Sequence, residues 1–492
     1  MDQMNSNSQK RPNILLFFSD QHRADAMGCA GDPAVITPNM DKLASEGVRF
    51  ERCCTNGPLC MPARTSLVTG QYINQHGQWG IQSTGTDPHG QSHVRNMRDA
   101  GYETLVFGKT HFVPFVAQSH GKYDEIQNLK DWGYTYIDYV SGGSGPDIEG
   151  NTYEAYLKEN GYYDILKEHF RGNHFRNGPT PLPLEATSDA YFTRKAVEWL
   201  RNYDGEKPFY MQVSVPGPHS PYDAPQSYLD RYDPAALPLP RVMDKPGEPV
   251  PSYLHCGGMT EEECRKEKQL YYAKVTVIDE CLGQVMRALE ENDLLDNTWV
   301  IYFSDHGEML GDHQMTGKEV FFHGSVNVPL IIRPPEGVTG WHSAALAETI
   351  DVAATVLDIA GAQPMAESEG RSLVPQIRAG DTPEGQQGKE AVFCELVRYS
   401  MICDGHYKMV VRTLTRDVTE LYDLDRDPNE TKNLAEDPEL AGVRERFLNT
   451  HFARLTAHAD MEMLRKVDEA NVVGPGGTTG VQGKNPFDVY LK

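Results

Sequence analysis

The chain has 492 residues and a formal net charge of −24, from 70 Asp and Glu against 46 Lys and Arg. Nucleic acids and anionic membranes are bound by spread-out Lys and Arg, so this balance argues against both as partners. The length is too great for one ordinary core and predicts a large domain plus a smaller one. An anionic substrate would have to be met by a local cluster of cations.

The N-terminal region and the cysteines bear on the cellular compartment. The apolar run around residues 14–18 is too short for a signal-peptide core or a membrane span. The nine cysteines are an odd number without paired spacing, which favours free thiols over a disulfide framework. We therefore expect a cytoplasmic protein.

Apolar runs and helical patterns alternate along the chain. NILLFFS at 13–19 predicts a buried strand that ends in Asp20. TPNMDKLASEGV at 37–48 predicts a helix with Thr37 as its N-cap, Pro38 at its first position and Gly47 at its end. Further helices are predicted over 189–205, 261–292 and 349–361, and further strands over 208–215, 298–304 and 328–335.

This alternation predicts an α/β fold in which a mostly parallel sheet is sandwiched by helices. In such sheets the ligand site lies beyond the carboxyl ends of the strands. Asp20, residues 216–219, and Asp305 with His306 all follow predicted strands. Three distant segments are therefore expected to meet at one edge of the sheet.

A change in composition predicts the domain boundary. Residues 362–390 are rich in Gly, Pro, Gln and Glu. Beyond them, strands are predicted over 391–397, 406–414 and the start of 419–435, and a closing helix over 438–460. We assign a catalytic domain to 11–375, a smaller C-terminal α+β domain to 376–470 and a Gly-rich tail to 471–492. The tail is a candidate either for a flexible end or for a segment that wraps a neighbouring subunit in a homo-oligomer.

Two segments carry ligands suited to a metal ion. Asp20 and Gln21 follow the first strand, and SDHGEMLGDH at 304–313 follows a later one. Carboxylate and amide oxygens at strand ends suit a hard divalent cation. Either segment alone is equally well explained by an Asp that caps a turn or helix. Their joint occurrence favours the metal.

Three further segments bring cations and histidines: GKTH at 108–111, PHSP at 218–221 and GKEVFFH at 317–323. Lys109, His111, His219 and Lys318 are the residue types that neutralise a tetrahedral oxyanion and transfer protons. Taken singly, each Lys would be a solvated surface charge and each His a hydrogen-bonded structural residue. These residues become informative only together with a recognisable motif.

The motif is CMPARTSLVTG at 60–70. A lone cysteine is by default a small buried hydrophobe. This segment, however, resembles the signature of the type I sulfatases, C-x-P-(S/A)-R followed by T-G, in which the cysteine is converted to formylglycine. GYETLVFGKTH at 101–111 resembles the family's second signature, with Phe107 where a smaller residue is usual. The likeness runs in the family's order over roughly residues 11–435, and it implies the fold of the alkaline phosphatase superfamily.

The resemblance implies a role for each matching residue. Cys60, as formylglycine, would be the nucleophile and a metal ligand, and Arg64 would hold it together with the carboxylates. The remaining metal ligands would be Asp20, Gln21, Asp305 and His306. Lys109 and Lys318 would bind sulfate oxygens, and His111 and His219 would be the acid and base candidates. The metal expected is calcium, with magnesium or manganese as alternatives, and a formylglycine-generating maturation enzyme is an implied partner.

Two positions depart from the commonest family pattern. Gln21 stands where many sulfatases have a second Asp, and His306 stands where many animal sulfatases have Asn. The Asp-Gln pair resembles the branch of choline sulfatases and phosphonate monoester hydrolases. Gln21 can still offer its amide oxygen, with one negative charge fewer.

The function implied is hydrolysis of a sulfuric ester, with release of inorganic sulfate from a sulfated small molecule or saccharide. The alternative within the superfamily is a phosphonate monoester or phosphodiester hydrolase, but Lys109 and His111 match the sulfatase pattern. From another class, an inactive binding module would keep Cys60 unmodified, and the intact set of titratable residues counts against it.

The substrate is less well indicated. The segment 131–181 is rich in Tyr, Trp, Asn and His, and it is equally consistent with a sugar- or aryl-binding surface and with a surface insertion. The pocket candidates near the motifs are His76, Gln78, Trp79 and His323.

Overall fold

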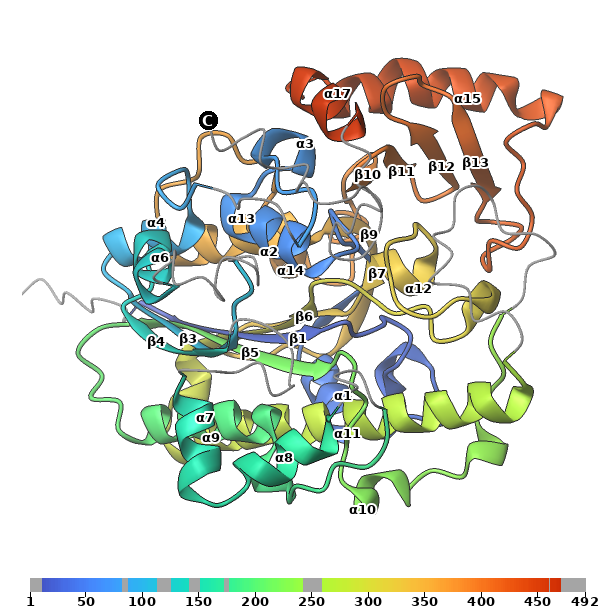
Figure 1. The fold of residues 1–492 in the computed structure, drawn as a ribbon. Helices are drawn as coiled ribbons and strands as arrows, with labels where there is room; N and C mark the ends of the chain where they lie inside the picture. Colours follow the sequence, from blue (N-terminus) through green and yellow to red (C-terminus); the bar gives the residue numbers. More distant parts are fainter. Residues whose placement is uncertain are drawn as a thin grey trace, which may run out of the picture.

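A computed structural model describes residues 11–81, 87–112, 125–140, 151–171, 177–241, 259–459 and 461–469. Its largest feature is a nine-stranded sheet (Figure 1) in the order β4-β3-β5-β1-β6-β8-β2-β7, with β9 also paired to β2. The strands are β1 Asn13–Asp20, β2 Val48–Cys54, β3 Glu103–Lys109, β4 Tyr136–Val140, β5 Phe209–Pro218, β6 Thr298–Ser304, β7 Asn327–Val328, β8 Leu330–Arg333 and β9 Trp341–Glu348.

The sheet is mostly parallel, as the alternation of elements predicted. Strand β1 lies between β5 and β6, and all three run in the same direction. Among the described strands of this nine-stranded sheet, only β7 and β8 run opposite to β1. The carboxyl ends of β3, β5, β1 and β6 therefore lie next to one another at one edge.

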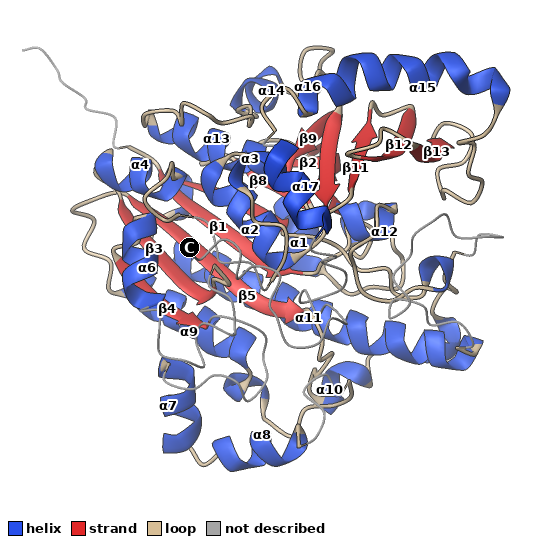
Figure 2. Ribbon diagram, turned by 45° about the horizontal axis from the view of Figure 1, so that its top comes forward, coloured by secondary structure: helices blue, strands red, loops and turns tan. Residues whose placement is uncertain are grey.

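Helices cover both faces of this sheet, which Figure 2 shows in blue on either side of the red strands. Side chains of a strand alternate between faces, and β1 divides accordingly. Leu15 and Phe17 pack with α1 (Pro38–Ser45), α9 (Ser188–Arg201) and α11 (Glu261–Glu291). Ile14, Leu16 and Phe18 pack with α2 (Cys60–Thr69), α4 (His93–Asp99), α6 (Glu125–Trp132) and α13 (Thr349–Ala360). The α/β sandwich predicted from the sequence is confirmed.

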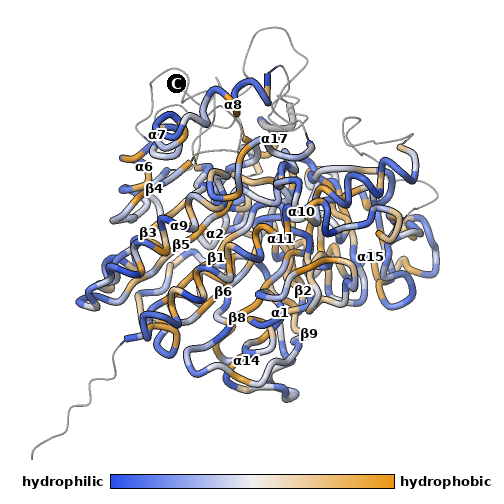
Figure 3. Tube along the Cα trace, turned by 90° about the horizontal axis from the view of Figure 1, so that it is seen from below, coloured by the Kyte–Doolittle hydropathy of each residue, from blue (hydrophilic) through white to orange (hydrophobic). Residues whose placement is uncertain are grey.

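The C-terminal part forms a second, antiparallel sheet in the order β10-β11-β12-β13, seen at the upper right of Figure 1. Its strands are β10 Val392–Leu396, β11 Tyr399–Cys403, β12 Tyr407–Arg412 and β13 Val418–Asp423. Phe393 and Met409 pack against Phe447 and Phe452 of the helical segment that follows. That segment consists of α15 Ala441–Phe447, a π-helical stretch Leu448–Phe452 and α16 Ala453–Leu455. In Figure 3, which colours the Cα trace by hydropathy, α15 lies at the periphery of the molecule, and its sequence AGVRERF carries both charged and apolar residues.

The other described helices lie mainly in connections. They are α3 Ile73–His76, α7 Thr152–Glu159, α8 Tyr163–His169, α10 Gln226–Leu229, α12 His323–Val326, α14 Val374–Ala379 and α17 Met461–Glu469. No described helix has the length and apolar character needed to span a bilayer. The eight cysteines within the described ranges are all free thiols, as expected. The predicted tail 471–492 lies outside the described residues, and the boundary after residue 375 stays a prediction.

Local details refine two of the predicted elements. Thr37 is the N-cap residue of α1, but its hydroxyl accepts the backbone N–H of Gly28 at 2.8 Å and does not cap the helix. Gly361 ends α13 with φ 60°, a left-handed conformation that suits glycine. Strand β11 and helix α17 had no counterpart in the sequence prediction.

Candidate active site

Four strand ends and one helix start bring the predicted residues together. Asp20 ends β1, Lys109 ends β3, His219 follows β5, and Asp305 follows β6. Cys60 is the first residue of α2, a helix whose ten residues are all buried. Cys60 itself is 1% exposed. Its thiol therefore lies inside the protein at the carboxyl edge of the sheet.

Cys60, Asp20, Asp305 and His306 could hold a metal ion. One donor atom from each residue lies within 4.8 Å of every other. Calcium binds its ligands at about 2.3–2.6 Å, so donors on opposite sides of one ion are separated by about this span. His306 Nδ1 is 3.1 Å from the Gly307 carbonyl oxygen, which leaves Nε2, 3.1 Å from Cys60 Sγ, for a ligand. The four residues thus fit a single divalent cation.

Arg64 joins the two carboxylates beneath this cluster. Its Nη2 donates to Asp20 Oδ2 and its Nε to Asp305 Oδ2, both at 2.9 Å. Nη1 donates to the Lys109 carbonyl oxygen at 2.9 Å and to the Ser214 hydroxyl at 3.0 Å. With 1% of its surface exposed, the guanidinium is fully committed to fixing the site.

Cations surround the Cys60 thiol. Lys318 Nζ lies 3.5 Å and Lys109 Nζ 3.8 Å from Sγ. Burial acts to raise the pKa of Cys60, but Lys109, Lys318 and His306 outweigh it and hold the pKa well below its ordinary value. A group with negative charge is therefore stabilised at this position, although the protein as a whole is strongly acidic.

The carboxyl of Asp20 is also held ionised. Burial and the neighbouring Cys60 act to raise its pKa, whereas Lys109, His219 and Arg64 act to lower it. The cations prevail, and the pKa lies below its usual range. Asp20 can therefore serve as an anionic ligand at every pH near neutrality.

Two histidines that hydrogen-bond the thiol follow different strands, His111 after β3 and His219 after β5. Burial lowers the pKa of His111 to about 4, although a hydrogen bond with Cys60 opposes the shift. Burial, Lys318 and Lys109 lower the pKa of His219, which also hydrogen-bonds with Cys60. His219 Nδ1 is 2.6 Å from the Ser220 carbonyl oxygen, so its Nε2 is the nitrogen left for the reacting group. Both rings are neutral bases near pH 7.

A buried ion cluster supports the end of β5. Asp189 accepts the backbone N–H of Gly217 at 2.8 Å, just before His219. Lys274 Nζ lies 2.8 Å from Asp189 and 2.6 Å from Asp223. Sequence reasoning missed these residues because no motif marks them.

Two other pocket candidates, His76 and Trp79, contact residues other than Cys60. Both ring nitrogens of His76 are bonded, Nε2 to the Ser66 hydroxyl at 2.9 Å and Nδ1 to the backbone N–H of Gln78 at 3.0 Å. Trp79 packs with Ile73 and with Leu464 of α17. These contacts are structural, and a role of His76 or Trp79 toward substrate stays a prediction.

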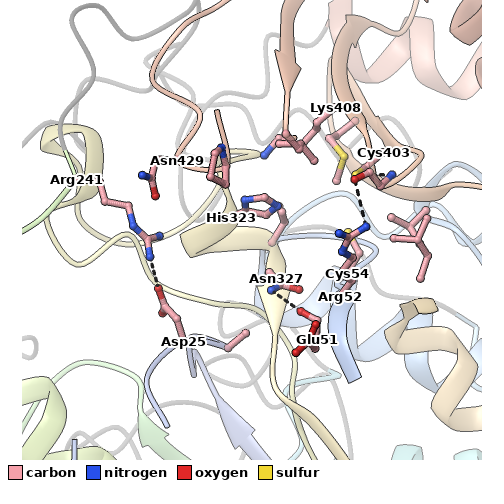
Figure 4. A pocket seen from close by; sticks show the side chains of 18 residues that line it. Asp25, Glu51, Arg52, Cys54, Arg241, His323, Asn327, Cys403, Lys408 and Asn429 are labelled. Atoms are coloured by element: carbon pink, nitrogen blue, oxygen red, sulfur yellow. Dashed lines mark hydrogen bonds and ion pairs between the residues drawn. The ribbon is translucent and has the colours of Figure 1, made fainter. Parts of the chain in front are cut away.

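His323 lines a separate cavity of about 380 Å³ between the two sheets (Figure 4). The cavity is bordered by Arg52 of β2, Lys408 of β12 and Arg241, and Cys60 is not among the residues that line it. The backbone N–H and the ring of His323 both face Glu430 rather than the thiol cluster. The structure thus separates His323 from Lys318, although both belong to one motif.

Sequence reasoning also missed two residues that touch the predicted set. Ser214, inside β5, bonds Arg64. Glu308 accepts the side-chain amide of Gln21, whose oxygen in turn accepts Lys318 Nζ. Glu308 stands within the quoted segment SDHGEMLGDH, so the signal was present, but its direction could not be inferred from spacing.

A mostly parallel sheet with carboxylates, an imidazole and clustered cations at its carboxyl edge is the arrangement of the alkaline phosphatase-like fold. The fold is similar to that of the phosphonate monoester hydrolase of Agrobacterium radiobacter, with a TM-score of 0.77 and 26% identity, covering 91% of this chain and 96% of that one. The fold class predicted from the sequence is thereby confirmed.

The family follows from the sequence comparisons. The Sulfatase family model matches residues 12–362, more than half of the chain, and the model for the C-terminal region of N-sulphoglucosamine sulphohydrolase matches residues 311–457. The chain belongs to the sulfatase family, and it is an enzyme of the sulfuric ester hydrolase class.

Two curated relatives are similar over most of their length. The multifunctional alkaline phosphatase superfamily protein PehA of Trinickia caryophylli is 29% identical, over 92% of this chain and 96% of that protein. The choline-sulfatase of Rhizobium meliloti is 29% identical, over 92% of this chain and 88% of that protein. The suspected family membership is confirmed, and the family implies a divalent metal and a formylglycine.

Proposed function

We propose that this protein cleaves sulfuric esters of small molecules or saccharides with a formylglycine made from Cys60. The observation that carries the proposal is the position of Cys60 Sγ, 3.1 Å from His306 Nε2, 3.5 Å from Lys318 Nζ and 3.8 Å from Lys109 Nζ. One side chain is thus adjacent both to the candidate metal ligands and to the cations that would hold a sulfate group.

An unmodified thiol is poorly suited to this reaction. A thiolate that attacked a sulfate ester would form a thiosulfate that is hard to clear. The hydrate of an aldehyde offers two hydroxyls, so one can attack sulfur while the other remains to expel the sulfate afterwards. Conversion of Cys60 therefore accounts for repeated turnover.

We assign the metal site to Asp20, Gln21, Asp305, His306 and the converted Cys60. A bound divalent cation, which we expect to be calcium with magnesium or manganese as alternatives, would supply charge to lower the pKa of the nucleophile and gather the sulfate oxygens. Asp20 and Asp305, fixed by Arg64, would hold it. A formylglycine-generating enzyme is then a required partner.

The remaining residues handle the substrate's charge and protons. Lys109 and Lys318 would bind the sulfate oxygens as the S–O bond to the alcohol breaks. The proton for the departing alkoxide would come from the Lys318 ammonium, or from His219 after its Nε2 has taken up the proton of the attacking hydroxyl. His111 would take the proton from the remaining hydroxyl as sulfate is expelled. The pKa of about 4 for His111 keeps its ring neutral and able to accept that proton at pH 7.

The substrate we favour is a sulfated monosaccharide or short oligosaccharide. Matching relatives include an N-acetylglucosamine-6-O-sulfatase from Bacteroides thetaiotaomicron, 26% identical over 86% of this chain. The choline-sulfatase relative keeps choline sulfate as a candidate. A panel of sulfate esters, assayed on protein with converted Cys60, would rank these classes.

Hydrolysis of phosphonate monoesters is the alternative, because a structure with that activity in its name matches the fold. Sulfate is favoured because Lys109 and His111 fit the sulfatase pattern in the second signature. Parallel assays with an aryl sulfate and a phenyl phosphonate ester separate the two. A higher kcat/KM for the phosphonate ester would reverse the assignment.

Conversion of Cys60 is tested directly. Mass spectrometry of the peptide that contains Cys60 should find an aldehyde in place of the thiol when the maturation enzyme is co-expressed. Cys60→Ala should abolish turnover while the melting temperature stays close to that of the wild type. Substantial activity of Cys60→Ala would rule out the nucleophile.

A further inference from the structure

We propose that Glu308 is a positioning residue that acts through the amide of Gln21 and thereby fixes Lys318 at the reacting group. The inference rests on the proposed function, because Lys318 is the residue expected to bind sulfate. It adds Glu308, which belongs neither to the Cys60 motif nor to the cluster of four candidate metal ligands.

Two hydrogen bonds connect Glu308, Gln21 and Lys318 in that order. Gln21 Nε2 donates to Glu308 Oε2, and Gln21 Oε1 accepts from Lys318 Nζ. An ammonium can only donate and a carboxylate can only accept, so just one orientation of the Gln21 amide satisfies both neighbours. Glu308 thus determines that the oxygen of Gln21, and not its NH₂ group, faces Lys318.

Glu308 is itself held firmly. The carboxylate is 1% exposed. Its Oε1 accepts the backbone N–H of Leu310 at 3.0 Å and that of Gly317, and the Tyr222 hydroxyl hydrogen-bonds the same carboxyl group. Since its anchors are mainly backbone groups, the carboxylate cannot turn away from Gln21 without leaving buried donors unpaired.

The backbone of Gln21 is fixed from two sides. Its N–H donates to Asp305 Oδ1 at 3.1 Å, and its carbonyl oxygen accepts the Tyr271 hydroxyl at 2.8 Å. Its φ of 67° is in the left-handed region, which a glutamine occupies only when its surroundings impose it. With its backbone fixed, Gln21 can still rotate its side chain, and the hydrogen bonds to Glu308 and Lys318 restrain that rotation and the orientation of the amide.

The arrangement has a consequence for charge. A carboxylate that accepts an amide N–H polarises the amide and makes its oxygen a better acceptor. Gln21 carries no charge of its own, whereas Glu308 places a negative charge one hydrogen bond behind it. The Gln21 oxygen beside Lys318 is thereby polarised, although the side chain at position 21 is neutral.

Exchange of the amide at position 21 and the carboxylate at position 308 tests this hydrogen-bonded arrangement. In Glu308→Gln, the single oxygen of the new amide is claimed by Leu310 and Gly317, so its NH₂ group faces that of Gln21. Gln21 must then turn, and its NH₂ group points at the Lys318 ammonium. In Gln21→Glu, two carboxylates face each other across the same bond. Each single variant should lower kcat/KM for an aryl sulfate about 10- to 100-fold, as for other residues that orient ligands of a site.

The double variant Gln21→Glu/Glu308→Gln restores the pairing. The carboxylate introduced at position 21 would accept from the amide at position 308 with one oxygen and from Lys318 with the other, and the net charge equals that of the wild type. We expect it to recover most of the lost kcat/KM, a coupling typical of residues in direct contact. A double variant as impaired as the worse single variant would overturn the proposal, as would single variants with wild-type kinetics.

A second readout does not depend on turnover. Binding of inorganic sulfate, measured by calorimetry on protein with unconverted Cys60, should weaken in both single variants and recover in the double. Glu395→Gln is the matched control, because Glu395 is a buried carboxylate whose partners include Asn74. It should lower the melting temperature and leave sulfate binding unchanged. Equal loss of sulfate binding in the control would mean that Glu308 acts only on stability, and the proposal would fall.

These measurements also distinguish a failure of the positioning role from a failure of the proposed function. Should Glu308→Gln fail to fold, Gln21→Glu against the double variant still decides the matter. If no sulfate ester is cleaved by the wild type but the sulfate-binding pattern holds, the proposed function fails and the positioning role stands. If esters are cleaved and the pattern is absent, the reverse is true.

Discussion

Replacement of Arg64 by alanine tests how far the active site depends on one buried cation. The change removes the guanidinium that bridges Asp20 and Asp305, at 2.9 Å each, and leaves two carboxylates that are 0–1% exposed. Breaking a buried ion pair by removal of one partner costs about 3–5 kcal/mol. The lost bonds to the Lys109 carbonyl and the Ser214 hydroxyl place Arg64→Ala toward the upper end of that range.

The assay is urea-induced unfolding followed by tryptophan fluorescence. It uses protein with unconverted Cys60 in a chelating buffer, so that neither maturation nor metal binding differs between variants. Arg426→Ala is the control, because the Arg426 side chain is 88% exposed and lies 3.7 Å from Asp423. Such a surface change should alter stability by less than about 0.5 kcal/mol. A loss below about 1 kcal/mol for Arg64→Ala would refute the role given to this bridge, since it would fall short of the cost of a broken buried ion pair.

Two further predictions concern pH and metal. Burial lowers the pKa of His93 to about 4, against an ordinary value of 6.5. The unfolded chain therefore takes up a proton as the pH falls below 6.5, while the folded protein does not until near pH 4, so stability is lost in that interval. The free energy of unfolding falls between pH 7 and pH 5, and His93→Gln should make this fall smaller by about 2 kcal/mol. The same fall in His93→Gln as in the wild type would contradict the prediction. Chelation of divalent cations should abolish sulfate ester hydrolysis and lower the melting temperature, and calcium should restore both; full activity of the chelated, metal-free protein would exclude the assigned metal site.

The sequence alone predicts the elements whose burial is periodic. Strands β1, β5 and β6 are short apolar runs, and each is buried along its whole length. The ends of β1 and β6 were identified because Asp20 and Asp305 come directly at the end of the apolar run, whereas β5 continues to Pro218, beyond its predicted end at residue 215. Helices α11 and α13 carry an apolar face and clear end signals, such as Gly361. These features depend on local sequence, so a single amino-acid sequence is enough to predict them.

Elements that depend on their partners escaped prediction. Strand β11 is five residues long and follows β10 after a two-residue turn, so its apolar run merges with that of β10. It becomes recognisable only as the middle of an antiparallel sheet, where Met401 pairs with both Cys394 and Val410. Helix α17 contributes Leu464 to a small cluster with Ile73, nearly four hundred residues away in sequence. Contacts of this kind are set by the tertiary structure.

The candidate site likewise has a part that the sequence predicts and a part that only the structure shows. The residue types at strand ends indicated which side chains would meet, and the structure brings Asp20, Cys60, Asp305 and His306 into one cluster. His323 belongs to the same predicted segment as Lys318, yet it lines a cavity that does not include Cys60. Between these two residues the chain turns, and a turn reverses side-chain direction in a way that spacing does not reveal.

The loop after β6 shows most clearly what spacing leaves undetermined. Asp305, Glu308 and Asp312 follow one another at intervals of three and four residues, which on a helix would place all three on one face. The chain is not helical from residue 305 to residue 311, and Asp312 only begins a short 3₁₀ helix. Each carboxylate has a different partner: Arg64 for Asp305, Gln21 for Glu308 and Arg23 for Asp312. Two of these partners, Gln21 and Arg23, follow directly on β1. The short segment after β1 is therefore fixed to the loop after β6 by two side-chain contacts of opposite kind, one through an amide and one through a guanidinium. An exchange of charge at one contact should leave the other intact, which is why the Gln21 and Glu308 variants can be expected to alter the site without separating the two loops.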